Sequence, residues 1–155
     1  MPAALEKAQR YRLLNEPAAA ESICLDVLTV DPGNQQAHVM LVLSISDQLP
    51  QELSSGVRRA REVLVHVADE YKRAYYNGIV CERYAVAQLR HDAPRAGESA
   101  YEWLREAMQW FERAEAMRAP GNDESILRWN TCARLIARTP SLVPATREEY
   151  EPSLE

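Results

Sequence analysis

The side chains best suited to metal binding or proton transfer are the three histidines, His38, His66 and His91. None of them has a partner at metal-ligand spacing, and the sequence holds no H-E-x-x-H motif, no Gly-rich phosphate loop and no G-x-S-x-G motif. His66 follows an apolar run, which favours a structural place in or beside the core. The histidines therefore predict no metal site and no cofactor.

The three cysteines, Cys24, Cys81 and Cys132, are odd in number, widely separated and without a C-x-x-C pair. This favours reduced thiols that act as small core hydrophobes in a reducing compartment. Cys81 precedes Glu82 and Arg83, and nothing around it predicts a reactive thiolate. Asp and Glu total 23, so surface carboxylates are expected everywhere and no acid–base pair stands out. We therefore expect no catalytic residue and no enzyme.

The net charge of -5 argues against nucleic-acid binding, because phosphate neutralisation needs a basic face. The one dense basic run, R-R-A-R at residues 58–61, is followed at once by Glu62 and is typical of a solvated helix face. The longest apolar run, Ala37–Leu43, is too short to span a membrane, and the N-terminus lacks an apolar signal region. We expect a cytoplasmic protein with neither a nucleic-acid nor a membrane partner.

A layout that occurs twice organises the chain, at residues 20–34 and again at residues 107–122. Each copy has an Ala, a larger apolar residue four positions later, a helix-compatible residue seven positions later and a closing Pro-Gly-Asn turn. These positions hold Ala20, Cys24 and Val27 in the first copy and Ala107, Phe111 and Ala114 in the second. Such an echo indicates an array of helical repeats.

The layout resembles the second half of a tetratricopeptide repeat (TPR), a unit of about 34 residues with an Ala, an aromatic residue four positions on and a terminating Pro. Ala20, Ala60 and Ala107 are 40 and 47 residues apart, which fits that period if loops are inserted at residues 48–56 and 90–99. The resemblance covers residues 3–138. The excess of Arg over Lys is typical of a bacterial genome rich in G and C.

The resemblance implies an all-α fold. It would be a TPR-like α-α superhelix, a right-handed stack of antiparallel helix hairpins, with about three repeats and a C-terminal capping helix. The first half of a repeat is echoed by A-Y-Y-N-G-I-V at residues 74–80. Its register starts either from Tyr75 with Gly78 or from Tyr76 with Ile79.

Hydrophobic periodicity and turn residues predict one helix after another. The expected ranges are residues 3–15, 17–30, 34–48, 54–67, 70–90, 100–118 and 122–138. The sixth, capped by Ser99, has the heaviest apolar face and buries Phe111, and the seventh covers the end of the array. Residues 139–155 hold three prolines and four glutamates, which predicts a flexible acidic tail beyond a helical domain of residues 1–138.

The resemblance also implies a site, since the first helix of each hairpin would line a concave groove that holds a peptide. The chain would then be an adaptor or scaffold that binds a segment of another protein. The groove candidates are Gln9, Arg12, Gln36, Val39, Leu43, Ser46, Asn77, Arg83, Tyr84, Arg128, Thr131 and Arg134. Four of them are arginines, which suit carboxylates, so an acidic or C-terminal peptide fits as the ligand.

Other roles stay open. The clamp with which heat-shock co-chaperones hold a carboxyl terminus is not expected, because the aligned positions hold Leu5, Gln9, Leu43, Tyr76 and Val80. A small secretion-type chaperone with a TPR fold has a similar size and acidity. A self-associating structural protein is the third possibility, with tyrosines and tryptophans forming a homo-oligomer face. The acidic tail could also fold back onto the arginines of the groove.

Overall fold

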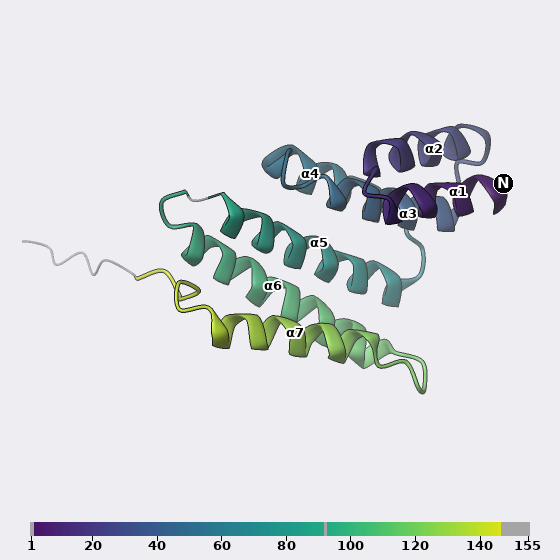
Figure 1. Cartoon of the computed structure of the whole chain (residues 1–155). Coiled ribbons are helices and arrows are strands. Elements are labelled where there is room, and N and C mark those ends of the chain that lie inside the picture. The colour runs from purple at the N-terminus through teal and green to yellow at the C-terminus, as the bar shows by residue number, and fades with distance from the viewer. Residues whose placement is uncertain (1, 92, 147–155) are drawn as a thin grey trace, which may run out of the picture.

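The computed structural model describes residues 2–91 and 93–146, and within them it consists of seven α-helices without a strand (Figure 1). The helices are α1 (Pro2–Leu13), α2 (Pro17–Val30), α3 (Gln35–Asp47), α4 (Leu53–Leu64), α5 (Glu70–Arg90), α6 (Ala96–Met117) and α7 (Glu124–Arg138). The expected all-α class is confirmed. Within the described ranges, none of the helices is long and apolar enough to cross a membrane.

Local chemistry explains several helix starts. Pro17 is the first residue of α2, where its missing N–H has no intrahelical partner to lose. The side chains of Asn34 and Asp69 accept hydrogen bonds from the backbone N–H of Ala37 and Lys72, and so cap α3 and α5.

The predicted cap at Ser99 was wrong. α6 begins at Ala96, and Ser99 lies inside it, where its hydroxyl shares hydrogen bonds with the side chain of Gln88 on α5. α4 begins at Leu53, and the preceding Glu52 makes no side-chain cap hydrogen bond. At α6 the hydrogen bonds to Gln88 hold Ser99 within the helix rather than at its start. At α4 the first residue, Leu53, is half-buried and packs against the core.

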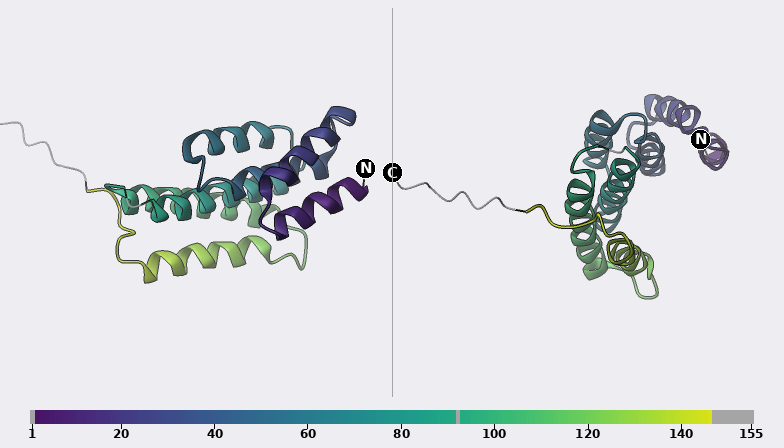
Figure 2. Two further views of the ribbon diagram at one scale, coloured as in Figure 1. Left: turned by 45° about the horizontal axis from the view of Figure 1, so that its top comes forward. Right: turned by 60° about the vertical axis from the view of Figure 1, so that its left-hand side comes forward.

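Consecutive helices pack against each other in chain order (Figure 1). In addition, α1 packs on α3 and α3 packs on α5, so the odd-numbered helices α1, α3 and α5 form a continuous layer. Figure 2 shows the α1–α2 hairpin at one end of the molecule and α7 at the other. The two predicted insertions also meet, because His91 Nε2 lies 2.8 Å from the carbonyl oxygen of Pro50.

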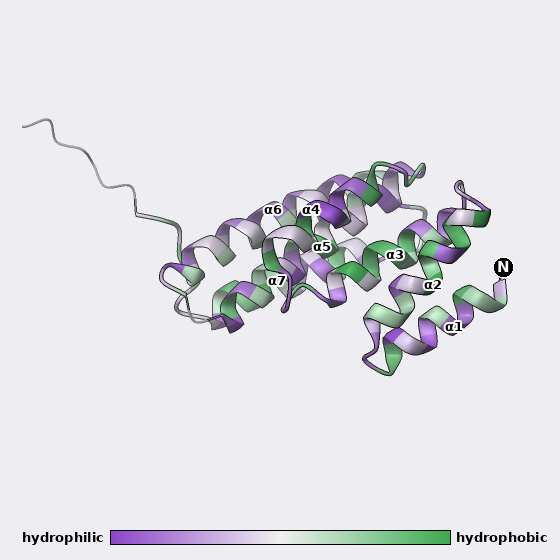
Figure 3. Cartoon of the chain, turned by 90° about the horizontal axis from the view of Figure 1, so that it is seen from above, coloured by the Kyte–Doolittle hydropathy of each residue, from purple (hydrophilic) through white to green (hydrophobic). Residues whose placement is uncertain are grey.

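The core is continuous through two adjoining clusters, one mainly within α1–α4 and one within α5–α7. Figure 3 shows hydrophobic residues concentrated along α3, which lies in the interior of the first cluster. The three alanines that recur near the repeat period, Ala20, Ala60 and Ala107, are each 0% exposed. A methyl group at these positions lets neighbouring helices approach closely, so the echo in the sequence marks helix-crossing points.

Gly78 of α5 lies directly against the ring of Phe111 of α6. A Cβ atom at Gly78 would lie 2.5 Å from Cε1 of the Phe111 ring, and Phe111 itself is 1% exposed. The Tyr75 ring lies one turn before Gly78, with its centroid 5.9 Å from that of Phe111. Tyr75 and Gly78 therefore face α6 together, while the Tyr76 side chain turns toward α3.

The chain after α7 continues to pack on the helices as far as Leu142, which is 4% exposed within the α5–α7 cluster. The backbone at Ser141 closes over Gly97, where a Cβ atom would clash with the Ser141 carbonyl. The expected flexible tail of residues 139–155 thus begins with a docked segment. The four glutamates of that tail and Pro152 lie outside the described residues.

Candidate functional site

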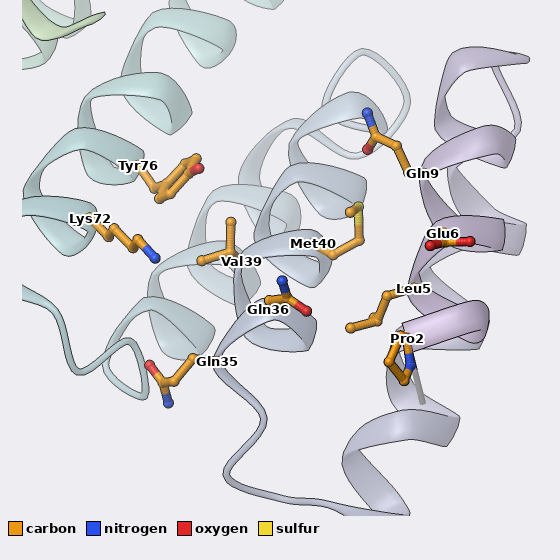
Figure 4. Close-up of a pocket in the computed structure, with 10 residues that line it drawn as sticks. All are labelled: Pro2, Leu5, Glu6, Gln9, Gln35, Gln36, Val39, Met40, Lys72 and Tyr76. Atoms are coloured by element: carbon orange, nitrogen blue, oxygen red, sulfur yellow. The ribbon is translucent and has the colours of Figure 1, made fainter. Parts of the chain in front are cut away.

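A cavity of about 490 Å³ opens across the layer of α1, α3 and α5, toward the N-terminal ends of these helices (Figure 4). It is lined by Pro2, Leu5, Glu6, Gln9, Gln35, Gln36, Val39, Met40, Lys72 and Tyr76. Three of the predicted groove residues, Gln9, Gln36 and Val39, are brought together here. Gln9 belongs to α1 and the other two to α3, so the cavity depends on the packing of α1 against α3.

The cavity combines an apolar floor with polar walls. Leu5, Val39, Met40 and Tyr76 supply hydrocarbon and an aromatic ring, and glutamine amides from α1 and α3 surround them. Figure 4 shows Glu6 on the α1 side and Lys72 on the α5 side, with α3 between them. The two opposite charges leave the lining close to neutral.

The glutamine amides differ in what they already bind. Gln35 donates to the carbonyls of Gly33 and His66 and accepts from the N–H of Ala68, so it links two turns. Gln9 accepts a hydrogen bond of 3.1 Å from Arg12 Nη1 and keeps its amide N–H groups. Gln36 is exposed, and its side chain makes no hydrogen bond within the described part of the chain. Gln9 and Gln36 are therefore the two amides free to pair with a ligand.

A charge network joins the C-terminal ends of α1 and α3 to the second half of α5. Asp47 of α3 accepts a hydrogen bond of 2.8 Å from Arg12 Nε of α1 and one of 2.7 Å from Arg83 Nη1 of α5. Arg83 also donates to the Ser46 hydroxyl at 2.6 Å. Burial lowers the pKa of Arg83, and the Asp47 carboxylate opposes that shift. One carboxylate thus joins all three helices of the layer.

This network corrects the expectation that Arg12 and Arg83 are free basic contact points. Both guanidinium groups are paired with Asp47, and Ser46, which is 2% exposed, lies beneath them. The two arginines do lie on α1 and α5, which line the cavity. A half-buried cation needs an anionic partner, however, and here Asp47 of the same chain provides it. They therefore add little free positive charge for an acidic ligand.

Replacing Asp47 with Ala should lower the free energy of unfolding by about 2 kcal/mol, because two half-buried guanidinium groups lose their acceptor. Asp47→Asn keeps one oxygen and should lose less. Urea denaturation followed by circular dichroism measures both. The matched control is Glu62→Ala, whose pair with Arg58 is exposed (69% and 74%) and should change stability by less than about 0.5 kcal/mol. An Asp47→Ala loss no larger than that of the control contradicts the structural role of the network.

A second pair joins α5 to α7. Glu82, 8% exposed, has its Oε2 atom 3.7 Å from Arg128 Nη1, which is too long for a hydrogen bond, and this oxygen has no other partner among the described residues. Burial raises the pKa of Glu82, and the charges of Arg128 and Arg83 oppose that shift. Arg128, a predicted groove residue, is therefore engaged by Glu82.

The pKa of Glu82 predicts a pH-dependent stability. Because the folded state raises this pKa above 4.5, the folded protein holds the proton more tightly than the unfolded chain does. The contribution of Glu82 is therefore complete below pH 4.5 and is lost as the pH rises through the pKa of the folded state. Glu82→Gln should gain stability relative to the wild type between pH 4 and pH 7, as measured by urea denaturation. The exposed Glu62→Gln is the control, and an equal pH response of both variants would refute the assignment.

The remaining predicted residues do not reach the cavity. Leu43 is half-buried and packs against the α5–α7 cluster. The Asn77 side chain donates a hydrogen bond to the carbonyl of Arg73, and the centroids of the Tyr84 and Trp103 rings are 4.5 Å apart. Thr131 and Arg134 are exposed on α7. The structure thus separates these residues from Gln9, Gln36 and Val39.

Seven lining residues were not predicted as contacts: Pro2, Leu5, Glu6, Gln35, Met40, Lys72 and Tyr76. Most of them lie one helical turn or less from a predicted residue, at spacings of three or four from Gln9, Gln36 or Val39. Helical periodicity could therefore have identified further residues on the same helix faces, toward the N-termini of the helices. It could not show that this end of the layer is open while the other end is closed by charges.

The three cysteines do not line the cavity and are buried as free thiols. Burial raises the pKa of Cys24 to about 11 and those of Cys81 and Cys132 to about 12. Native protein should therefore resist iodoacetamide at pH 8, whereas all three thiols should react in urea, as mass spectrometry would show. Fast native alkylation of any of them contradicts the burial.

No cluster able to hold a metal ion occurs in the described ranges.

Comparison with known proteins gives no match to a family model, to a curated protein or to a solved structure.

Proposed function

We propose that this chain is a protein-interaction module that binds a segment of another polypeptide in the cavity across α1, α3 and α5. The observation on which this proposal rests is the cavity itself, where α1, α3 and α5 together form an apolar floor bordered by glutamine amides. Such a surface suits a peptide, since apolar side chains can enter the floor while amides pair with backbone N–H and C=O groups.

We further propose that the helix hairpins form a TPR-like superhelix and that the layer of α1, α3 and α5 is its concave face. Two observations support this. The alanines that recur near the repeat period are fully buried, and α3 contacts both α1 and α5. Both features are typical of stacked helical hairpins.

The chemistry of the cavity indicates a ligand with apolar anchor side chains and little net charge. Glu6 and Lys72 offset each other at the walls, and Arg12 and Arg83 are already paired with Asp47. The only cation that lines the cavity is Lys72, and because Glu6 offsets its charge an acidic peptide would find little net attraction. Affinity should therefore depend on apolar contacts and only weakly on salt.

A peptide library displayed on phage and panned against the immobilised chain tests the proposal. Recovered peptides, labelled with a fluorophore, are titrated with protein and followed by fluorescence anisotropy. We expect sequences with two or more large apolar residues. Val39→Asp should weaken binding by about tenfold or more, since it places a charge in the floor.

Val65→Asp is the matched control, because Val65 is 74% exposed and does not line the cavity. It should leave affinity unchanged, and circular dichroism verifies that both variants fold. Equal affinity of the wild type and Val39→Asp, or no peptide above background, would overturn the proposal.

A further inference from the structure

The outer face of the first hairpin carries a second cavity, of about 530 Å³. All of its lining residues belong to α1 and α2, and none to α3, so it is separate from the cavity proposed to bind peptide. The lining residues are Ala4, Lys7, Tyr11, Ala19, Ser22, Ile23, Asp26, Val27 and Val30. Figure 2 shows this hairpin at one end of the molecule, and the helix that packs against both α1 and α2 is α3.

This face is apolar for an end of a helical array. Val30 is 69% exposed, Tyr11 and Ile23 are only partly buried, and Leu14, one turn beyond Tyr11, is also 69% exposed. Helical arrays need polar outer faces on their terminal units to remain soluble. At the other end, α7 exposes Thr131, Arg134 and Arg138 together with two large apolar residues, Ile126 and Leu127. The exposed and half-buried apolar residues of the α1–α2 face thus depart from the polar surface expected of a terminal unit.

The charges on this face are self-complementary. Lys7 of α1 and Asp26 of α2 are both exposed, both line the cavity, and neither forms an ion pair within residues 2–91 and 93–146. In a two-fold symmetric contact, if residue i of one copy contacts residue j of the other, then residue j of the first copy also contacts residue i of the second. A second copy rotated onto the hairpin can thus place its Asp26 against Lys7 and its Lys7 against Asp26.

We propose that two copies of this chain associate through their α1–α2 hairpins as a symmetric dimer. Tyr11, Ile23 and Val30 form its apolar centre, and two Lys7–Asp26 pairs form its edges. A two-fold contact uses the same face on both copies, so the assembly closes at two chains and does not grow into a filament. The peptide cavity across α1, α3 and α5 remains open in this dimer.

The size of the face predicts a weak dimer. Helices of 12 and 14 residues are about 18 and 21 Å long, and two side by side are about 20 Å wide, so each copy offers roughly 400 Å². A total near 800 Å² is below the roughly 1,200 Å² of stable complexes and is typical of transient ones. Association should be reversible and visible only at high protein concentration.

Charge reversal distinguishes this dimer from other modes of association. The wild type is examined by sedimentation velocity from about 10 to 500 µM, where it should shift from monomer toward dimer. Lys7→Glu and Asp26→Lys should each weaken self-association by about tenfold or more, because each creates two like-charge contacts. An equimolar mixture of the two variants should regain the wild-type affinity, since both pairs in the heterodimer are then of opposite sign.

Arg105→Glu on α6 is the matched control, an exposed charge reversal outside the face that should not change association. A wild type that remains monomeric over the whole range overturns the proposal. So does a mixture that associates no better than its components, which would place the contact elsewhere. None of these results bears on peptide binding, because no variant touches the peptide cavity.

Discussion

Phe111→Ala is expected to lower the free energy of unfolding by about 3–5 kcal/mol, the range for large-to-small changes at buried aromatic residues. Phe111 is 1% exposed, and its ring packs on the Gly78 backbone and beside Tyr75. The ring therefore fills the crossing of α5 and α6, the two longest helices, of 21 and 22 residues. Neither helix can move to close the cavity without losing its other contacts.

Urea denaturation followed by tryptophan fluorescence and circular dichroism measures the loss. Phe111→Leu fills most of the space and should lose much less. Met117→Ala, on the same helix but 42% exposed, serves as the control and should change stability by less than about 1 kcal/mol. A Phe111→Ala loss as small as that of Met117→Ala would mean that Phe111 is not part of the core.

Gly78→Ala is expected to destabilise the protein by about 1–3 kcal/mol, even though Ala is the better helix former by about 1 kcal/mol. The reason is steric, since the new Cβ atom would lie 2.5 Å from Cε1 of the Phe111 ring, which is itself fixed by packing. Gly33→Ala is the matched control, because a Cβ atom there meets nothing within 4 Å. That control should be neutral or slightly stabilising.

A double-mutant cycle separates the clash from a general cost of substitution at this site. In the Phe111→Ala background the ring is absent, so Gly78→Ala should become neutral or stabilising. The coupling between the two changes should then exceed about 1 kcal/mol. If Gly78→Ala is equally destabilising in both backgrounds, the close approach of α5 and α6 at this point is wrong.

The two proposed surfaces are separated by the first hairpin itself. The peptide cavity uses the sides of α1 and α3 that face α5, whereas the proposed dimer face uses the opposite side of α1 together with α2. Loss of binding in Val39→Asp should leave sedimentation unchanged, and loss of association in Lys7→Glu should leave peptide affinity unchanged. The two activities can therefore be measured and removed independently.

The sequence by itself determined the class of the fold and most of its elements. Helical periodicity and turn residues are local properties, so Pro17, Asn34 and the buried alanines at positions 20, 60 and 107 could be assigned from their neighbours in the chain. The same locality placed Gln9, Gln36 and Val39 on the helices that line the cavity. A spacing of three or four residues is sufficient to define a helix face.

Only the tertiary structure decided which of those faces is open. Asp47 is 35 residues from Arg12 and 36 from Arg83, and no local pattern shows that one carboxylate binds both. The same holds for Ser99 with Gln88, for Gly78 beneath Phe111 and for Leu142 within the core. Pairing and burial depend on which segments meet in space, and this follows from the packing of all helices together rather than from the period of any one of them.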